Sequence, residues 1–193
     1  GRTNRLLSYL TKNIAITFKK TLYAKKKSYH TGIPVRKNNF IRKKSNKIKT
    51  ILVIGGSQGA RAFSIIVPKL ISHFSEENKK KIFLIQQTRK SDMERVTESY
   101  NQMKLKFVVE EFLDNIYEQY NSSDLIISRC GASTLAEIEL FKKFAILFPL
   151  PGSMSNHQYF NALEFKKNNN CMILNEKKIN FVKDAKKIEK KIF

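Results

Sequence analysis

Three short segments rich in glycine and hydroxyl side chains could form ligand-binding turns. The first, residues 55–61 (GGSQGAR), follows an apolar run at 51–54. Its glycines let the backbone approach a ligand, Ser57 offers a hydroxyl and an N–H, and the helix expected next points its positive end at the same place, as in phosphate sites. The segment at residues 55–61 is neither a Walker A loop nor a GxGxxG turn. A turn that serves only tight strand–helix packing is the alternative.

The second segment, residues 128–137 (SRCGASTLAE), has glycine and hydroxyls at the expected start of a helix. Ser133 or Thr134 could be the N-cap with Glu137 completing a capping box, because Ser or Thr followed three residues later by Glu is that signature. Alternatively, Thr134 donates to a phosphate, and Glu137, one turn into the helix, accepts the hydroxyls of a ribose. The pattern leaves both interpretations open.

The third segment, residues 149–161 (PLPGSMSNHQYFN), is a Pro/Gly/Ser loop that leads into a helix with polar first turns. Gln158 and Asn161 lie one turn apart on one face of that helix. Carboxamides suit neutral, hydroxyl-rich ligands because each offers a donor and an acceptor. A helix start that merely faces solvent is the alternative for either residue.

The elements around these segments alternate between strands and helices. The expected strands cover residues 51–54, 82–85, 106–109, 125–128, 145–148 and 171–174. The expected helices cover residues 60–74, 92–103, 115–120, 133–141, 156–167 and 184–192. This alternation predicts an α/β fold with a doubly wound, Rossmann-like parallel sheet. Ligands of such sheets bind at the carboxyl ends of the strands, where all three segments fall, so we expect a pocket for a nucleotide-diphosphate sugar.

The first quarter of the chain differs in charge and pattern. Residues 1–50 hold 15 of the 37 Lys and Arg residues and none of the 16 Asp and Glu residues. This excess favours anionic partners, either lipid headgroups or nucleic acid, although AT-rich coding alone would enrich lysine. No nucleic-acid-binding motif supports the second partner. The apolar spacing at 5–20 predicts a helix, and residues 24–49 are typical of a linker with a short extended piece.

Other features narrow the class of protein. Cys130 and Cys171 form no CxxC or His/Cys cluster, so we expect reduced, buried thiols and neither a disulfide framework nor a metal site. No run approaches the ~18 apolar residues of a membrane-spanning helix, and no signal peptide is evident. Since the chain starts at Gly1 in mid-pattern, we expect it to be a fragment.

Four motifs, in this order and spacing, resemble the C-terminal domain of the MurG group of family 28 glycosyltransferases. They are ILVIGGSQGAR at 51–61, VEEFLDNI at 109–116, SRCGASTLAE at 128–137 and HQYFNA at 157–162. Upstream, TGIPVR at 31–36 resembles the family's GNPVR, with Ile33 in place of its asparagine, and residues 1–7 resemble a segment late in its first domain. His157 and Gln86 also depart from the family pattern. The resemblance implies that residues 1–47 are a remnant of the N-terminal acceptor domain plus an interdomain linker. It implies that residues 48–193 are the donor-binding domain, with an incomplete C-terminal helix.

The resemblance also implies which residues hold the donor, UDP-N-acetylglucosamine. Ser57 would contact the diphosphate, the backbone of Leu113 would meet the uracil, and Glu137 would take the ribose hydroxyls. The side-chain amides of Gln158 and Asn161 would form hydrogen bonds with the sugar hydroxyls. The full set implied is Arg36, Gly56, Ser57, Gln58, Leu113, Ala132, Ser133, Thr134, Leu135, Ala136, Glu137, Gln158 and Asn161.

The activity implied is inverting, metal-independent transfer of N-acetylglucosamine to lipid I, which forms lipid II for peptidoglycan, with no cofactor. In the family the general base and the lipid I site belong to the N-terminal domain, so we expect this chain to bind donor without turnover. We expect an anionic membrane surface as a partner, on the cytoplasmic face of the bacterial inner membrane, and no nucleic acid. Two rivals remain: another family 28 transferase with a different donor or lipid acceptor, and a non-enzymatic basic nucleotide- or nucleic-acid-binding module.

Overall fold

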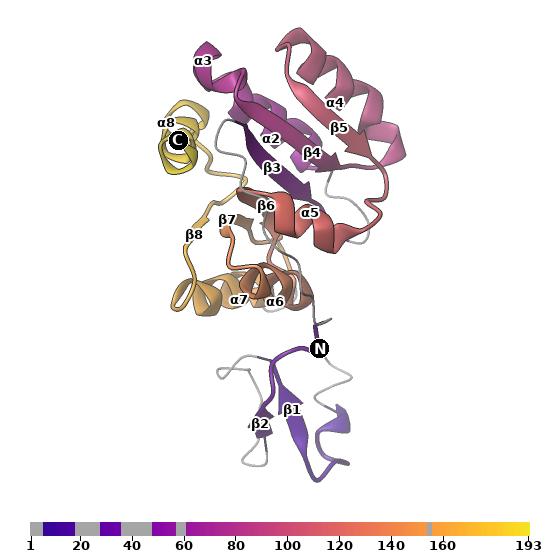
Figure 1. The fold of residues 1–193 in the computed structure, drawn as a ribbon. Coiled ribbons are helices and arrows are strands. Elements are labelled where there is room, and N and C mark those ends of the chain that lie inside the picture. Colours follow the sequence, from indigo (N-terminus) through magenta and orange to yellow (C-terminus); the bar gives the residue numbers. More distant parts are fainter. Residues whose placement is uncertain (1–5, 18–27, 36–47, 57–60, 154–155) are drawn as a thin grey trace.

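Six parallel strands form the main sheet of the protein. The computed structural model describes residues 6–17, 28–35, 48–56, 61–153 and 156–193. The strands run in the order β5-β4-β3-β6-β7-β8, and every neighbouring pair is parallel (Figure 1). Their bounds are β3 Lys49–Ile54, β4 Ile82–Gln87, β5 Lys106–Glu110, β6 Leu125–Arg129, β7 Phe144–Phe148 and β8 Cys171–Ile173. The predicted doubly wound sheet is therefore confirmed.

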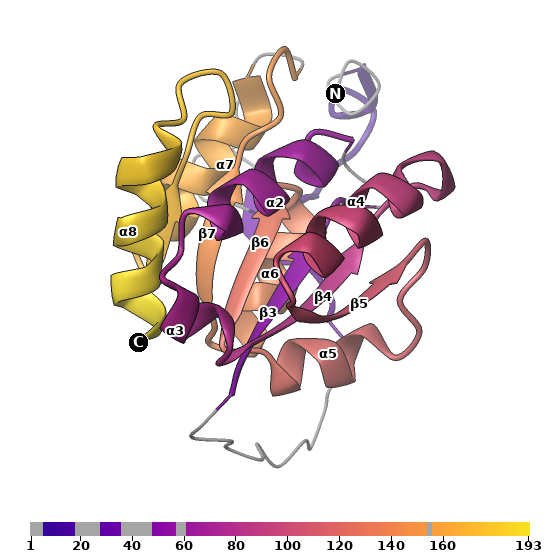
Figure 2. The ribbon, with the colours of Figure 1, turned by 90° about the horizontal axis from the view of Figure 1, so that it is seen from above.

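The central strands are apolar on both faces because helices cover the sheet on both sides. In β3, Ile51 and Val53 pack into one core cluster, whereas Leu52 and Ile54 pack into the other. The first cluster lies under α2 (Phe63–Ser72), α4 (Lys90–Gln102) and α8 (Phe181–Ile192). The second lies under α5 (Ile116–Ser122), α6 (Ala132–Leu140) and α7 (His157–Lys166). Figure 2 shows α2 and α4 in front of the sheet and α6 behind it.

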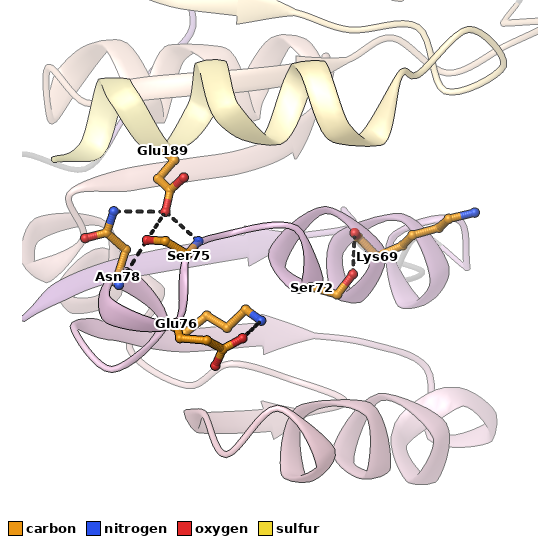
Figure 3. Close-up of polar contacts among 7 residues, drawn as sticks. Lys69, Ser72, Ser75, Glu76, Asn78 and Glu189 are labelled. Carbon is orange, nitrogen blue, oxygen red and sulfur yellow. Dashed lines mark hydrogen bonds and ion pairs between the residues drawn. The ribbon is translucent and has the colours of Figure 1, made fainter.

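The last helix, α8, is fastened to a short helix that the sequence pattern did not predict, α3 (Glu76–Lys79). One carboxylate oxygen of Glu189 accepts hydrogen bonds from the backbone N–H of Ser75 at 2.8 Å, the Ser75 hydroxyl at 2.7 Å and the Asn78 amide at 2.9 Å (Figure 3). Ser75 also caps α3 through the N–H of Asn78. Side-chain bonds therefore join the end of the chain to the α2–α3 corner.

The helix predicted at residues 5–20 is wrong for the part that the structure describes. Only Leu6 and Leu7 are helical there, a turn follows, and β1 (Ile14–Ile16) pairs in parallel with β2 (Ser28–His30). β-Branched Ile14 and Ile16 favour a strand once a partner strand is present. β2 confirms the short extended piece expected in the linker. The division of the chain at residue 47 stays a prediction.

Candidate functional site

The turns after β3 and β6 meet at the topological switch of the sheet. The chain leaves β3 for β4 and β5 on one side and returns to β6 on the other. Ile54, at the end of β3, is in register with Ser128, and Arg129, at the end of β6, is in register with Phe148 of β7. The three predicted ligand-binding segments therefore begin on adjacent strand ends. This is where open parallel sheets bind their ligands.

The first segment needs glycine for its backbone shape. Gly56 has φ +80°, a conformation that side-chain-bearing residues rarely adopt. It lies half-buried at the end of the described part of the turn. Ser57 and Gln58 lie outside the residues that the structure describes, as does Arg36, so their predicted roles remain predictions.

The second segment starts α6 without a side-chain cap. Its N-cap is Gly131, no side chain caps this end of the helix, and the N–H of Leu135 bonds to the carbonyl of Gly131 at 3.0 Å. The N–H groups of residues 132–134 have no partner within a helix, so they and the helix dipole attract an anion. Ser133 is exposed, and Ala132, Thr134 and Ala136 are half-buried. Leu135 instead packs its side chain into the second core cluster.

Glu137 does not complete a capping box. Its Oε2 accepts a hydrogen bond from the phenol of Tyr120, in α5, at 2.8 Å. The side chain is half-buried. The capping interpretation of this segment is therefore wrong, because the N-cap is a glycine and the carboxylate bonds to a neighbouring helix. What remains is a carboxylate one turn into a helix whose N-terminus lies at the switch of the sheet.

The two amides of the third segment hold neighbouring turns together. The side-chain oxygen of Gln158 accepts from the backbone N–H of Cys130 at 3.2 Å and from that of Leu150 at 3.0 Å. The side-chain nitrogen of Asn161 donates to the carbonyl of Cys130 at 3.1 Å. Both residues are half-buried, so the alternative of a solvent-facing helix start is wrong for them. These bonds use neither Nε2 of Gln158 nor Oδ1 of Asn161.

Leu113 lies in the connection between β5 and α5. Its side chain is only 7% exposed and packs in the second core cluster with Tyr120 and Leu135. A side chain fixed in this way leaves only the backbone of Leu113 available to a ligand, which fits the backbone role predicted for it.

An ion pair at the site was missed by the sequence analysis. The guanidinium of Arg129 lies 2.6 Å from the carboxylate of Glu176, and the two side chains are 11% and 18% exposed. The same guanidinium lies 4.8 Å from the ring centroid of Phe63 in α2 and bonds to the carbonyl of Phe148 at 3.4 Å. Arg129 thus connects the carboxyl ends of β6 and β7 with the start of α2. Arg129 and Glu176 are 47 positions apart in the sequence, so no local sequence pattern indicates that they form a pair.

Both cysteines are free thiols, as predicted, but they differ in exposure. Cys130 is buried and Cys171 is only partly buried, so the burial predicted for both thiols is wrong for Cys171. Burial raises the pKa of the Cys130 thiol to about 12, although the charge of Arg129 opposes that rise. Burial also raises the pKa of Cys171. Cys130 therefore contributes to packing and, through its backbone, to the bonds with α7.

Two features are absent from the residues that the structure describes, a membrane-spanning helix and a metal-ligand cluster. None of the helices there combines the length and the apolar character needed to cross a bilayer. Within the same ranges, no three His, Cys, Asp or Glu side chains gather as ligands for a metal ion would.

Residues 50–192 match the glycosyltransferase family 28 C-terminal domain. A UDP-N-acetylglucosamine--N-acetylmuramyl-(pentapeptide) pyrophosphoryl-undecaprenol N-acetylglucosamine transferase of Sulfurihydrogenibium sp. is 36% identical over 98% of this chain and 57% of its own length. The transferase of the same name from Rickettsia canadensis is 38% identical over 84% of this chain and 49% of its own length. The chain therefore spans about half the length of the curated relatives it matches.

Solved structures share the fold. The crystal structure of Acinetobacter baumannii MurG superposes with a TM-score of 0.82 at 24% identity, over 100% of this chain and 55% of that one. The glycotransferase of kitacinnamycin superposes with a TM-score of 0.61 at 10% identity, over 95% of this chain and 56% of that one. The sheet is thus that of the C-terminal half of a GT-B glycosyltransferase. With the sequence match over residues 50–192, the chain belongs to glycosyltransferase family 28, through the C-terminal domain of that family.

Proposed function

We propose that this chain is the donor-binding part of an enzyme that transfers N-acetylglucosamine from UDP-N-acetylglucosamine to lipid I, forming lipid II for peptidoglycan. The names of its relatives describe that donor and a pyrophosphoryl-undecaprenol acceptor. One structural observation carries the proposal for this chain. The N-terminus of α6, which no side chain caps, lies beside the carboxyl end of β3 at the switch of the sheet, with Glu137 one turn further on.

This arrangement suits a nucleoside diphosphate. The N–H groups that start α6 and the positive end of its dipole would bind the phosphates. The carboxylate of Glu137 would accept from the ribose hydroxyls, and the uracil would meet the backbone at Leu113. Nε2 of Gln158 and Oδ1 of Asn161 would then face the sugar, one as a donor and the other as an acceptor.

The reaction would be a single displacement at the anomeric carbon. The 4-hydroxyl of the acceptor forms the new glycosidic bond on the face opposite the departing UDP, so the configuration inverts. Negative charge develops on the diphosphate as its bond to the sugar breaks, and the start of α6 would stabilise that charge without reorganising. Arg36, Ser57 and Thr134 are further candidates for this role. The general base would come from the N-terminal domain of the whole enzyme, so this chain alone would bind donor and not turn over.

We also propose that the whole enzyme works at an anionic membrane surface, on the cytoplasmic face of the inner membrane. The net charge of +21 supports this, as does the outward face of α8. Both acidic side chains of that helix bond within the protein: Asp184 is buried and lies 3.6 Å from the ammonium of Lys187, and Glu189 bonds to Ser75 and Asn78. The lysines of the helix are exposed, namely Lys183, Lys186, Lys187, Lys190 and Lys191. Such a face gains attraction to anionic lipids, about 1 kcal/mol for each lysine near the surface.

Calorimetric titration of the chain tests the donor assignment. We expect UDP-N-acetylglucosamine to bind without added magnesium, more tightly than UDP-glucose or UDP-galactose. Glu137→Ala should weaken binding by about tenfold or more, because a hydrogen bond to a charged group contributes about 1.5–3 kcal/mol. A preference for another sugar would favour a different family 28 transferase. No binding by folded chain, together with salt-steep binding of nucleic acid that ignores Glu137→Ala, would favour the nucleic-acid-binding module.

A further inference from the structure

The phenol of Tyr120 fixes one oxygen of the Glu137 carboxylate. The hydroxyl donates to Oε2 over 2.8 Å, from α5 to α6. A carboxylate has two oxygens and roughly four acceptor positions. This bond therefore restricts the rotation of the group and leaves Oε1, with the remaining lone pair of Oε2, for a ligand.

Tyr120 itself has little freedom to move. Its side chain is 1% exposed, and its ring stacks on that of Phe141 with centroids 5.5 Å apart and planes 11° from parallel. The ring of Tyr117 meets both rings edge-on, at 6.4 Å from Tyr120 and 5.7 Å from Phe141. Three aromatic rings from α5 and the end of α6 thus hold the hydroxyl in place. A donor fixed by packing orients its acceptor at little entropic cost.

The phenol also stays protonated, and so remains a donor. Burial raises the pKa of Tyr120, and the neighbouring charge of Glu137 raises it further. The hydroxyl therefore remains a donor at neutral pH. Because Tyr120 lies in the core, its hydroxyl reaches a ligand only through the carboxylate.

We infer that Tyr120 is a positioning residue that aims the carboxylate of Glu137 at the ribose hydroxyls of the nucleotide. The inference rests on the proposed function, since it needs a ribose in the site. It assigns the preference for a ribonucleotide to the pair rather than to Glu137 alone. The role differs from simple packing, because the ring of Tyr120 packs whether or not the hydroxyl is present.

The test compares UDP with 2′-deoxy-UDP in four chains: wild type, Tyr120→Phe, Glu137→Ala and the double variant. Tyr120→Phe keeps the ring stack and removes only the donor. Tyr100→Phe is the matched control, because Tyr100 is also fully buried and its hydroxyl bonds to Gln86, but it belongs to α4 and packs in the other core cluster. Thermal melting confirms that each variant is folded before titration.

We expect the wild type to prefer UDP, and Tyr120→Phe to weaken UDP binding by about tenfold, the size of one hydrogen bond to a charged group. Binding of 2′-deoxy-UDP, which keeps only the 3′-hydroxyl, should weaken by less, so the preference shrinks. Tyr100→Phe should leave both affinities unchanged, and Tyr120→Phe should add nothing in the Glu137→Ala background, since both changes act through one carboxylate.

Three results would overturn the inference, and they are distinguishable. If the wild type binds UDP and folded Tyr120→Phe keeps the wild-type affinity for both nucleotides, the positioning role is wrong and the proposed function stands. If both nucleotides weaken equally, Tyr120 acts on the site as a whole and the assignment to ribose is wrong. If folded wild-type chain binds neither nucleotide, the proposed function fails and this inference fails with it.

Discussion

The guanidinium of Arg129 and the carboxylate of Glu176 form an ion pair at 2.6 Å, and both side chains are largely buried at the carboxyl edge of the sheet. The pair joins β6 to the segment after β8, and the face of Phe63 lies 4.8 Å from the guanidinium. The pair therefore fixes the framework on which the turn after β6 is built.

Glu176→Ala should destabilise the fold by about 3 kcal/mol, because removing one partner of a buried pair leaves the other charge uncompensated. Urea denaturation of the purified variant measures this loss. The control is Glu77→Ala, which breaks the ion pair of Glu77 with Lys81 at 2.5 Å, where both side chains are exposed. We expect the control to lose far less stability, because solvent screens an ion pair between exposed side chains. Equal losses in the two variants would show that the Arg129 pair is no more than a surface contact.

We expect the two ends of the Gln158 amide to have different roles: the oxygen stabilises the fold, and the nitrogen binds the ligand. Gln158→Glu keeps an oxygen for the N–H groups of Cys130 and Leu150, so its stability should stay within about 1 kcal/mol of the wild type. Gln158→Ala leaves the buried N–H of Cys130 without its partner and should lose about 1–3 kcal/mol. Thermal and urea denaturation of both variants measure these changes.

Gln158→Glu should nevertheless bind UDP-N-acetylglucosamine at least about tenfold more weakly, because it removes the donor nitrogen and places a negative charge near the diphosphate. Calorimetry gives this ratio. Wild-type affinity in this variant would mean that Gln158 supports the turns and does not touch the donor.

The part of the fold that the sequence predicts well is the part that is buried on both faces. β3, β6 and β7 each contain a continuous apolar run, at residues 51–54, 125–127 and 144–148. Short apolar runs that alternate with helices are typical of buried parallel strands. By contrast, the spacing of Leu6, Leu7, Leu10 and Ile14 fits a helix locally, yet Ile14–Ile16 pairs with Ser28–His30. The local pattern holds no information about that partner strand.

In the candidate site, too, the sequence predicts local features and misses contacts between distant residues. The three turns could be placed because each follows a strand, and parallel strands bring their carboxyl ends to one edge. The capping box was wrong because the partner of Glu137 is Tyr120, 17 positions away on another helix. The Glu189 contact with Ser75 spans 114 positions and fixes α3, a helix of four residues with no apolar period of its own. Long-range polar pairing is what the sequence pattern leaves out.

Glu189 should make the docking of α8 depend on pH. Partial burial alone raises the pKa of Glu189, but the hydrogen bonds from Asn78 and Ser75 lower it by more, so the pKa lies below the ordinary 4.5. A lowered pKa in the folded state gives stability above the unfolded pKa that is lost as the pH falls through the folded one. The wild type should thus exceed Glu189→Gln in stability near neutral pH, and the difference should shrink below about pH 4.5. A difference that stays constant from neutral pH to the acid range would contradict this role.

The two thiols should react at very different rates in the folded chain. Cys171 is partly exposed, whereas Cys130 is buried and its pKa is about 12. Because the thiolate is the nucleophile, iodoacetamide at mildly alkaline pH should modify Cys171 first, and Cys130 at least about 100-fold more slowly. Peptide mass spectrometry over time measures both rates, and Cys171→Ala should leave no fast-reacting thiol. Rapid modification of Cys130 in that variant would mean that the carboxyl end of β6 opens readily.

Amide hydrogen exchange with and without saturating UDP-N-acetylglucosamine tests the central claim most directly, because it locates the nucleotide on the fold. We predict slower exchange in peptides that cover residues 130–137 and 150–161, where α6 and α7 begin, and no change over α8 (Phe181–Ile192). Protection confined to α8, or no protection in a chain shown to bind the nucleotide, would contradict a donor site at the β3–β6 switch.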